Sequence, residues 1–163
     1  MKDPEIKDLK EKKLIGLSVH TSLADDKTSL LWKRFMERKA NIGNQKSDDL
    51  YSVQLYDNNI IKGQFNSQSV FEKWAAVEVS SVPPLFGGLK ELIIPSGLYA
   101  VFVHVGTANE FARTANFIFG EWIPASKYEL DDRPHFEVLD KDYKGLDDPE
   151  SKEHIWIPIK LKT

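Results

Sequence analysis

The sequence contains an internal repeat, and this limits the possible folds more than any other feature. Three segments of the first half have counterparts in the second half, in the same order and 82 to 84 residues further on. The pairs are LSVHT (17–21) with VFVHV (101–105), YSVQLYD (51–57) with PHFEVLD (134–140), and FEKWAAVEV (71–79) with EHIWIPIKL (153–161). Three matches in nearly one register indicate a duplication, with each half forming one structural unit.

Each half is expected to fold as strand, helix, strand, strand. The matched segments alternate apolar and polar residues, which is typical of half-buried strands. Between the first two strands of each half lies a segment with apolar residues at helical spacing. These residues are Leu31, Phe35 and Met36 in the first half, and Phe111, Ala115, Ile118 and Trp122 in the second. Thr107 and Glu110 form a capping-box pattern at the start of the second helix.

The expected fold class is α+β, with two βαββ units related by a pseudo-twofold axis. Their antiparallel strands carry the helices on one face and leave a ligand groove between the repeats. Repeat one covers about 12–80, a connector rich in Pro and Gly covers 81–97, and repeat two covers about 98–161. Residues 1–11 have the character of a polar lead-in before a single domain at 12–163.

Composition and charge exclude several functional classes. The net charge is −3 and the pI is near 5.8, so there is no basic footprint for nucleic acid. The absence of cysteine removes disulfides, thiolate metal sites and cysteine nucleophiles, and it fits the reducing cytoplasm. The charged N-terminus is not a signal peptide, and no apolar run approaches the roughly 20 residues that span a membrane. We expect a cytoplasmic protein without a cofactor and without nucleic-acid or membrane partners.

Glu137 is the most informative single residue. It lies in a strand-like segment, RPHFEVLDK (133–141), although strands disfavour glutamate and buried glutamates are rare without a partner. The duplication aligns Glu137 with Gln54, so one half carries a charge where the other carries a neutral side chain of similar shape. This asymmetry suits a site on the pseudo-twofold axis that needs one negative charge. A solvated surface position is the alternative.

Three longer segments carry a family resemblance: LKELIIPSGLYAVFVHVG (89–106), GEWIPASKYELDDRPHFEVLD (120–140) and HIWIPIKL (154–161). Together they resemble the GyrI-like small-molecule-binding family. Its members are effector-binding domains of multidrug-responsive bacterial transcription activators, and some stand alone. The resemblance covers about residues 12–161 and leaves no room for a helix-turn-helix domain, so it implies a stand-alone member.

The resemblance implies a groove for planar, apolar and often cationic organic molecules, with an acidic residue at its base. By motif, the acidic residue corresponds to Glu137, the aromatic residue of the last strand to Trp156, and the helix-end tryptophan to Trp122. The chain departs from the family at Leu139, where many members have a tyrosine. This removes a hydroxyl group that in some relatives could take part in chemistry.

Aromatic side chains are expected to form the walls of this groove. The proposed ligand-binding set is Glu137 as the charge, Gln54 beside it, Trp74, Trp122, Trp156 and Tyr56 as walls, and Tyr143 as a flap. Stacking of a cation on tryptophan contributes about 0.5 to 2 kcal/mol, and a carboxylate compensates the ligand's charge. Apolar surroundings are expected to raise the pKa of Glu137.

Other conspicuous residues have structural explanations. Trp32 lies at a helical position that favours packing in the core. His20 and His104 occupy matching strand positions and are expected to be hydrogen-bonded strand residues. Two histidines without a third ligand make a poor metal site, so no metal is expected.

Three functions remain open from the sequence. The first is binding of amphipathic organic compounds, for sensing or sequestration. The second is hydrolysis of reactive small molecules, with Glu137 as the base and Tyr56, Tyr128 or Tyr143 as partner. The third is a protein-interaction module, such as a gyrase inhibitor or the partner of a regulator, which would use the acidic loop at 140–150.

Overall fold

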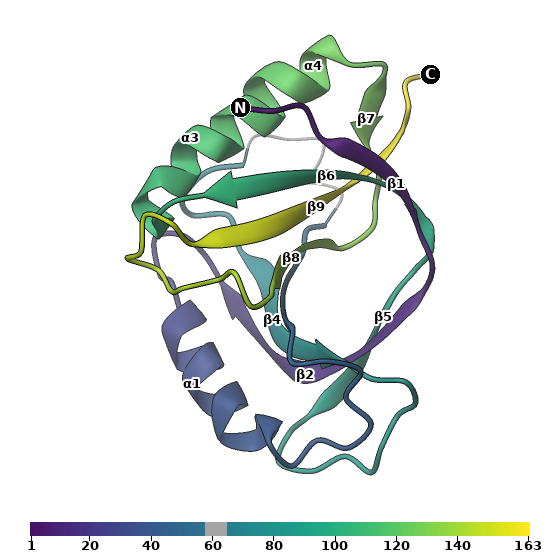
Figure 1. Ribbon diagram of the computed structural model, residues 1–163, viewed down its shortest axis with the longest axis vertical. Coiled ribbons are helices and arrows are strands. Elements are labelled where there is room, and N and C mark those ends of the chain that lie inside the picture. Colours follow the sequence, from purple (N-terminus) through teal and green to yellow (C-terminus); the bar gives the residue numbers. More distant parts are fainter. Residues whose placement is uncertain (58–64) are drawn as a thin grey trace.

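One antiparallel sheet dominates the structure, a computed structural model that describes residues 1–57 and 65–163 (Figure 1). Its strands are β1 (Glu5–Leu9), β2 (Lys12–Thr21), β3 (Leu50–Leu55), β4 (Phe71–Glu78), β5 (Lys90–Ile94), β6 (Gly97–Val105), β7 (Tyr128–Leu130), β8 (His135–Leu139) and β9 (Lys152–Leu161). The helical segments are α1 (Thr28–Lys39), η1 (Ala108–Glu110), α3 (Phe111–Asn116), the π-helical η2 (Phe117–Trp122) and α4 (Ile123–Ala125). The fold class is therefore α+β, as predicted.

The strand order is symmetric about its centre. It runs β1-β6-β9-β8-β3-β4-β2-β5, and β7 pairs with the end of β9. The strands that the sequence matched as equivalents lie at mirrored places: β2 with β6, β3 with β8, and β4 with β9. The order is what a pseudo-twofold axis between β3 and β8 would produce. The duplication itself stays a prediction.

Alternation along the strands gives the sheet two different faces. On the first, here called the inner face, a core of aromatic and aliphatic side chains includes Tyr51, Trp74, Tyr99 and Phe136. The helices cover the second, which we call the helix-bearing face. There α1 packs on residues of β2 and β4, whereas α3, η2 and α4 pack on β6 and β9. Figure 1 shows these two helical groups at opposite ends of the longest axis.

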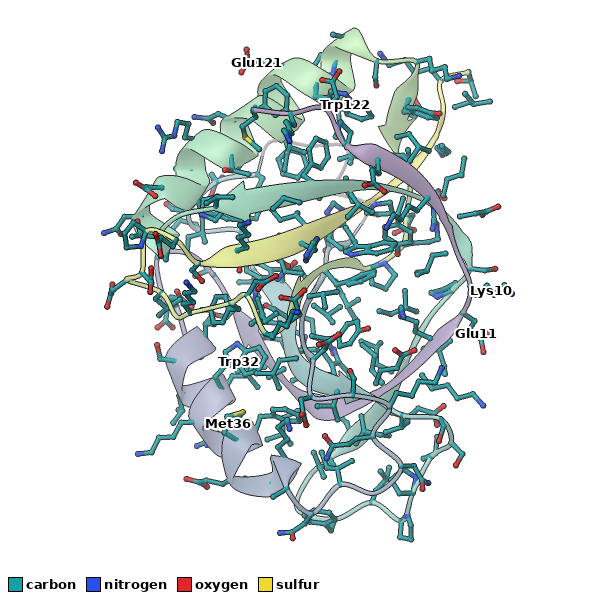
Figure 2. All side chains as sticks on the ribbon, viewed as in Figure 1. Lys10, Glu11, Trp32, Met36, Glu121 and Trp122 are labelled. Atoms are coloured by element: carbon teal, nitrogen blue, oxygen red, sulfur yellow. The ribbon has the colours of Figure 1, made fainter. Side chains whose placement is uncertain are left out.

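The helices follow their apolar positions with one exception. Leu31 and Phe35 are buried under α1, but Met36 is 49% exposed, so its predicted core position was wrong. The capping box is present, since the Thr107 backbone N–H donates to Glu110 Oε2 at 2.9 Å. Figure 2 shows Trp32 on α1 and Trp122 at the end of η2. Among the described residues, no helix has the length and apolar character to cross a membrane.

A short connection forces the sheet to curl. Only Lys10 and Glu11 join β1 to β2, yet these strands lie first and seventh in the order. Both ends of the sheet must therefore approach each other around the inner face, and Leu9 and Leu14 meet there in one core cluster. Figure 2 labels Lys10 and Glu11 on the outer edge of this curve.

Two segments that lacked a strand signal are strands. The predicted lead-in contains β1, whose residues pair with β6 and whose Leu9 is only 8% exposed. The predicted connector contains β5, which pairs with β2. Both strands have five residues and lie at the ends of the sheet order. Short edge strands commonly carry charged side chains, and these charges hid the alternation of apolar and polar residues in the sequence.

Candidate functional site

Four polar side chains lie together at the centre of the helix-bearing face. The pairing of β3 with β8 places Ser52 opposite Glu137 and Gln54 opposite His135. Ser52, Gln54 and His135 are each less than 9% exposed. Because α1 covers β2 and β4 while the other helices cover β6 and β9, these side chains lie between the two helical groups. The four residues are called the central polar cluster below.

In the described part of the chain, Glu137 has a buried carboxyl oxygen atom without a hydrogen-bond partner. Its Oε2 atom is buried and has no hydrogen-bond partner among the described residues. Burial raises the pKa of Glu137, whereas the positive charge of Lys73 and a hydrogen bond from Gln54 lower it by less. The predicted rise in pKa is confirmed. The hydrogen bond also joins Glu137 to the residue that the sequence repeat aligned with it.

A second carboxylate, Glu153, faces the same region from β9. Burial and the negative charge of Glu137 raise the pKa of Glu153 to about 7, and Lys73 opposes this shift. Lys73 reaches the region from β4, where it pairs with Gln54. Two carboxylates and one ammonium group therefore share the centre of this face.

Aromatic rings border the cluster on the side of His135. The His135 ring meets Tyr56 edge to face, with centroids 5.0 Å apart, and stacks on Phe119 at 6.3 Å. Burial lowers the pKa of His135 to about 4, so its ring is neutral at physiological pH, and its Nε2 atom lacks a partner among the described residues. Burial and then the charge of Glu137 raise the pKa of Tyr56, which places this phenol near the carboxylate.

Tyr143 and His104 lie on the Glu153 side of the cluster. Burial raises the pKa of Tyr143, and the charge of Glu153 raises it further. His104 pairs with Glu153 across the β6–β9 ladder. Its Nδ1 atom lies 2.7 Å from Thr114 Oγ1 and its Nε2 atom 3.0 Å from the Thr107 carbonyl oxygen. The prediction that His104 is a hydrogen-bonded strand residue is confirmed.

The structure separates Trp74 and Trp156 from Glu137. Both tryptophans pack in the inner-face core, where Trp156 stacks on Phe136 with centroids 5.3 Å apart. Phe136 precedes Glu137 in β8, and successive strand side chains point to opposite faces. These two tryptophans therefore cannot form walls around Glu137. The prediction failed because an indole signals burial and does not specify the face.

Trp122 lies on the helix-bearing face but belongs to its own packing group. Its ring meets Phe102 edge to face at 5.4 Å and stacks on Tyr128 at 6.2 Å. It thus helps to anchor η2 on β6 and β7. The described contacts do not join it to Glu137, so its role in ligand binding stays a prediction.

The two best-formed cavities of the described residues lie away from Glu137. One, of about 480 Å³, lies between α1 and β2 and is lined by residues that include Leu30, Arg34 and Arg38. The other, of about 370 Å³, includes Lys144 and Glu150 of the loop after β8. The groove that ends on Glu137 stays a prediction.

Sequence reasoning missed five residues of this region: Ser52, Lys73, Phe119, His135 and Glu153. A signal for Glu153 was present, because it continues the alternation of Ile155, Ile157 and Ile159 and must share their face. Phe119 gave no such signal, because it does not share the helical spacing of the apolar residues in its segment and was expected on the solvent side of the helix. The π-helical turn of η2, with its wider register, holds Phe119 against His135.

Comparisons with known proteins agree with this fold. The transcriptional regulator BrlR from Pseudomonas aeruginosa is 27% identical over 147 residues, which cover 90% of this chain and 51% of BrlR. The chain thus spans about half the length of that relative. The EcmrR C-terminal domain matches with a TM-score of 0.75 at 14% identity, covering 99% of this chain and all of that one.

A structure of SAV2435 bound to tetraphenylphosphonium matches with a TM-score of 0.69 at 13% identity. The match covers 98% of this chain and 94% of SAV2435. Similarities at this level of identity establish the fold alone. The profile of the GyrI-like small molecule binding domain matches residues 2–160. The chain therefore belongs to the GyrI-like family of small-molecule-binding domains.

Proposed function

We propose that this domain binds amphipathic organic cations at the central polar cluster, for multidrug sensing or sequestration. The observation that carries the proposal is the buried Oε2 atom of Glu137, which has no partner among the described residues. Membership of a small-molecule-binding family supports binding as such. The buried carboxylate supports a positive charge on the ligand.

The energetics of Glu137 favour a cationic ligand. A buried carboxylate with one oxygen atom left without a partner is costly in its ionised form, and the raised pKa of Glu137 reflects that cost. A ligand cation in contact with Oε2 would offset the free-energy cost of burying this carboxylate. The rings of Tyr56 and Phe119 both contact the His135 ring and offer apolar surface for the rest of a planar ligand.

A structural relative binds a molecule of this kind. SAV2435 was solved with tetraphenylphosphonium, a cation enclosed by four aromatic rings. The low identity limits this comparison to the fold, so it supports the ligand class only by analogy. We also expect a cytoplasmic location, a regulator as the protein partner and no direct contact with nucleic acid, in line with the acidic composition.

Titration with ethidium, a planar fluorescent cation, tests the proposal. We expect saturable binding by the wild type and a loss of about tenfold in Glu137→Gln, which corresponds to about 1.4 kcal/mol. Glu150→Gln removes an equal charge from a side chain that is 79% exposed and serves as the control. No binding by the wild type, or equal binding by Glu137→Gln, would contradict the proposal.

A second candidate function is hydrolysis, and Glu153 is the observation that favours it. General acid–base catalysis works best with a pKa near the operating pH, and the pKa of Glu153 is about 7. Glu137 and Glu153 would then divide the roles of base and acid. Turnover of strained electrophiles such as epoxides, lost in both Glu137→Gln and Glu153→Gln, is the result expected from an enzyme.

A further inference from the structure

We infer that Glu153 is a second ligand-binding carboxylate of this site, and that the site selects organic compounds with two positive centres. This inference rests on the proposed function, because it concerns the same site. The alignment of the two halves gave no indication of a role for Glu153, since its counterpart in the first half is the apolar residue Phe71.

Strand register brings the two carboxylates to one face. Glu137 lies opposite Ile155, so Glu153 is its diagonal neighbour, two residues along β9. Diagonal neighbours in an antiparallel pair lie about 7 to 8 Å apart, and their Cβ atoms are somewhat closer. Ile155 packs on the helix-bearing face, and Glu153 shares that face by alternation. One ligand of moderate size can therefore contact both groups.

The other strand carboxylates that are not fully exposed have close partners, whereas Glu137 and Glu153 form no ion pair in the part of the chain that the structure describes. Glu78 lies 3.2 Å from Lys12 Nζ, Glu72 accepts a hydrogen bond from Trp74 at 2.7 Å, and Glu129 lies 4.0 Å from Lys160 Nζ. Among the described residues, neither Glu137 nor Glu153 has an ion pair within 4.0 Å. The chain thus provides close contacts for the other partly buried strand carboxylates, whereas Glu137 keeps its Oε2 atom without a partner and Glu153 has no ion pair among the described residues.

The surrounding charged and titratable groups do not neutralise the pair by contact. They are Lys73 from β4, Tyr56 after β3, His135 from β8, Tyr143 from the following loop and His104 from β6. Lys73 lowers the pKa of both carboxyl groups, but it forms no ion pair with either. Both ring nitrogens of His104 are engaged by Thr114 and Thr107. Among the described residues, each carboxylate is therefore without a cation in direct contact.

The protonation of Glu153 gives this selectivity a pH dependence. Its pKa of about 7 in the free protein means that a cation binding to it must displace a proton at lower pH. Affinity for a ligand with two positive centres should therefore rise with pH and level off above about 7. The affinity for a ligand that has a single positive centre should depend less on pH, because such a ligand can bind to Glu137 alone.

A matched pair of dyes tests the inference. Ethidium and propidium share the phenanthridinium ring system, and propidium adds a quaternary ammonium group on a three-carbon arm. We expect the wild type at pH 8 to prefer propidium by about tenfold, a difference of about 1.4 kcal/mol, and to lose most of this preference at pH 6. Glu153→Gln should abolish the preference while retaining ethidium binding, whereas Glu137→Gln should weaken both dyes.

The outcomes separate this inference from the proposed function. Equal binding of both dyes by the wild type at pH 8, or an undiminished propidium preference in Glu153→Gln, would overturn the inference and leave the proposed function standing. Absence of binding of both dyes to the wild type would overturn both. The preference should remain intact in Glu150→Gln, since this exposed carboxylate pairs with Lys144 in the loop.

Discussion

Glu137 and Glu153 reduce the stability of the fold in their ionised forms. Burial raises the pKa of both groups, so the unfolded chain holds their negative charges more easily than the native state does. Glu78, a carboxylate of β4, is instead held by Lys12 and by the Tyr51 hydroxyl group. This contrast is what we expect if Glu137 and Glu153 bind the ligand, as proposed above, since a neutral residue at either position would stabilise the fold more.

The ionisation of Glu153 should lower the free energy of unfolding of the protein as pH rises. The native state keeps the Glu153 proton up to about pH 7, whereas the unfolded chain releases it near pH 4.5. The free energy of unfolding therefore falls as pH rises through this window, by at most about 3 kcal/mol. Glu153→Gln should match the wild type near pH 4.5 and exceed it in stability at pH 8, as measured by urea unfolding.

The control for this prediction is Glu150→Gln, which removes an equal charge from an exposed side chain and is unfolded in urea at the same two pH values. A difference between Glu153→Gln and the wild type that is the same at pH 4.5 and pH 8 would contradict the argument. It would mean that Glu153 is ionised in the native state as easily as in the unfolded chain.

At the scale of the strand, alternation decides which aromatic residues can reach a ligand. Phe119 reaches the central polar cluster from η2, whereas Trp74 lies under the Lys90 ammonium group on the inner face, 5.0 Å from the ring centroid. We therefore expect Phe119→Ala to weaken ethidium binding about three- to tenfold, the effect of losing one aromatic contact. Trp74→Phe should leave the affinity unchanged.

Both variants are compared in one ethidium titration, after thermal unfolding confirms that each is folded. Phe119 is 44% exposed, so its truncation leaves the core intact. An equal loss of affinity in Trp74→Phe would place the ligand on the inner face and would contradict the assignment of the site to the helix-bearing face.

The sequence predicted the elements with long, regular patterns. Six strands, the first helix and the capping box of the second helical group were found from alternation, helical spacing and capping residues. The strands β1 and β5 were missed because charged side chains hide their alternation, and β7 was missed because three residues carry too little pattern. Glu137 and Gln54 were found from their contrast within the repeat. The tryptophans of β4 and β9 were misplaced because their strands bury side chains on both faces.

At the scale of the molecule, the two halves are completed by strands from outside the repeat. β1 precedes the predicted repeat one but pairs with β6 of the predicted repeat two, and β5 lies in the predicted connector but pairs with β2 of the first half. The β3–β8 pair joins the halves at the centre of the sheet. We infer that neither half is a complete folding unit, although each contains a βαββ pattern.

Removal of residues 1–11 should therefore destabilise the whole domain. The deletion removes the backbone ladder between β1 and β6, the buried Leu9 side chain and the Lys7 ammonium group, which lies 5.7 Å from the centroid of the Trp156 ring. We expect the free energy of unfolding to fall by about 3 to 5 kcal/mol, mainly from the loss of one buried leucine and of several backbone hydrogen bonds. Urea unfolding followed by tryptophan fluorescence measures this change.

Deletion of residues 1–3, which precede the strand and are exposed, is the matched control and should leave stability unchanged. Equal stability of the two deletions would show that 1–11 is the dispensable lead-in that its charged sequence suggested, and that the sheet closes without β1.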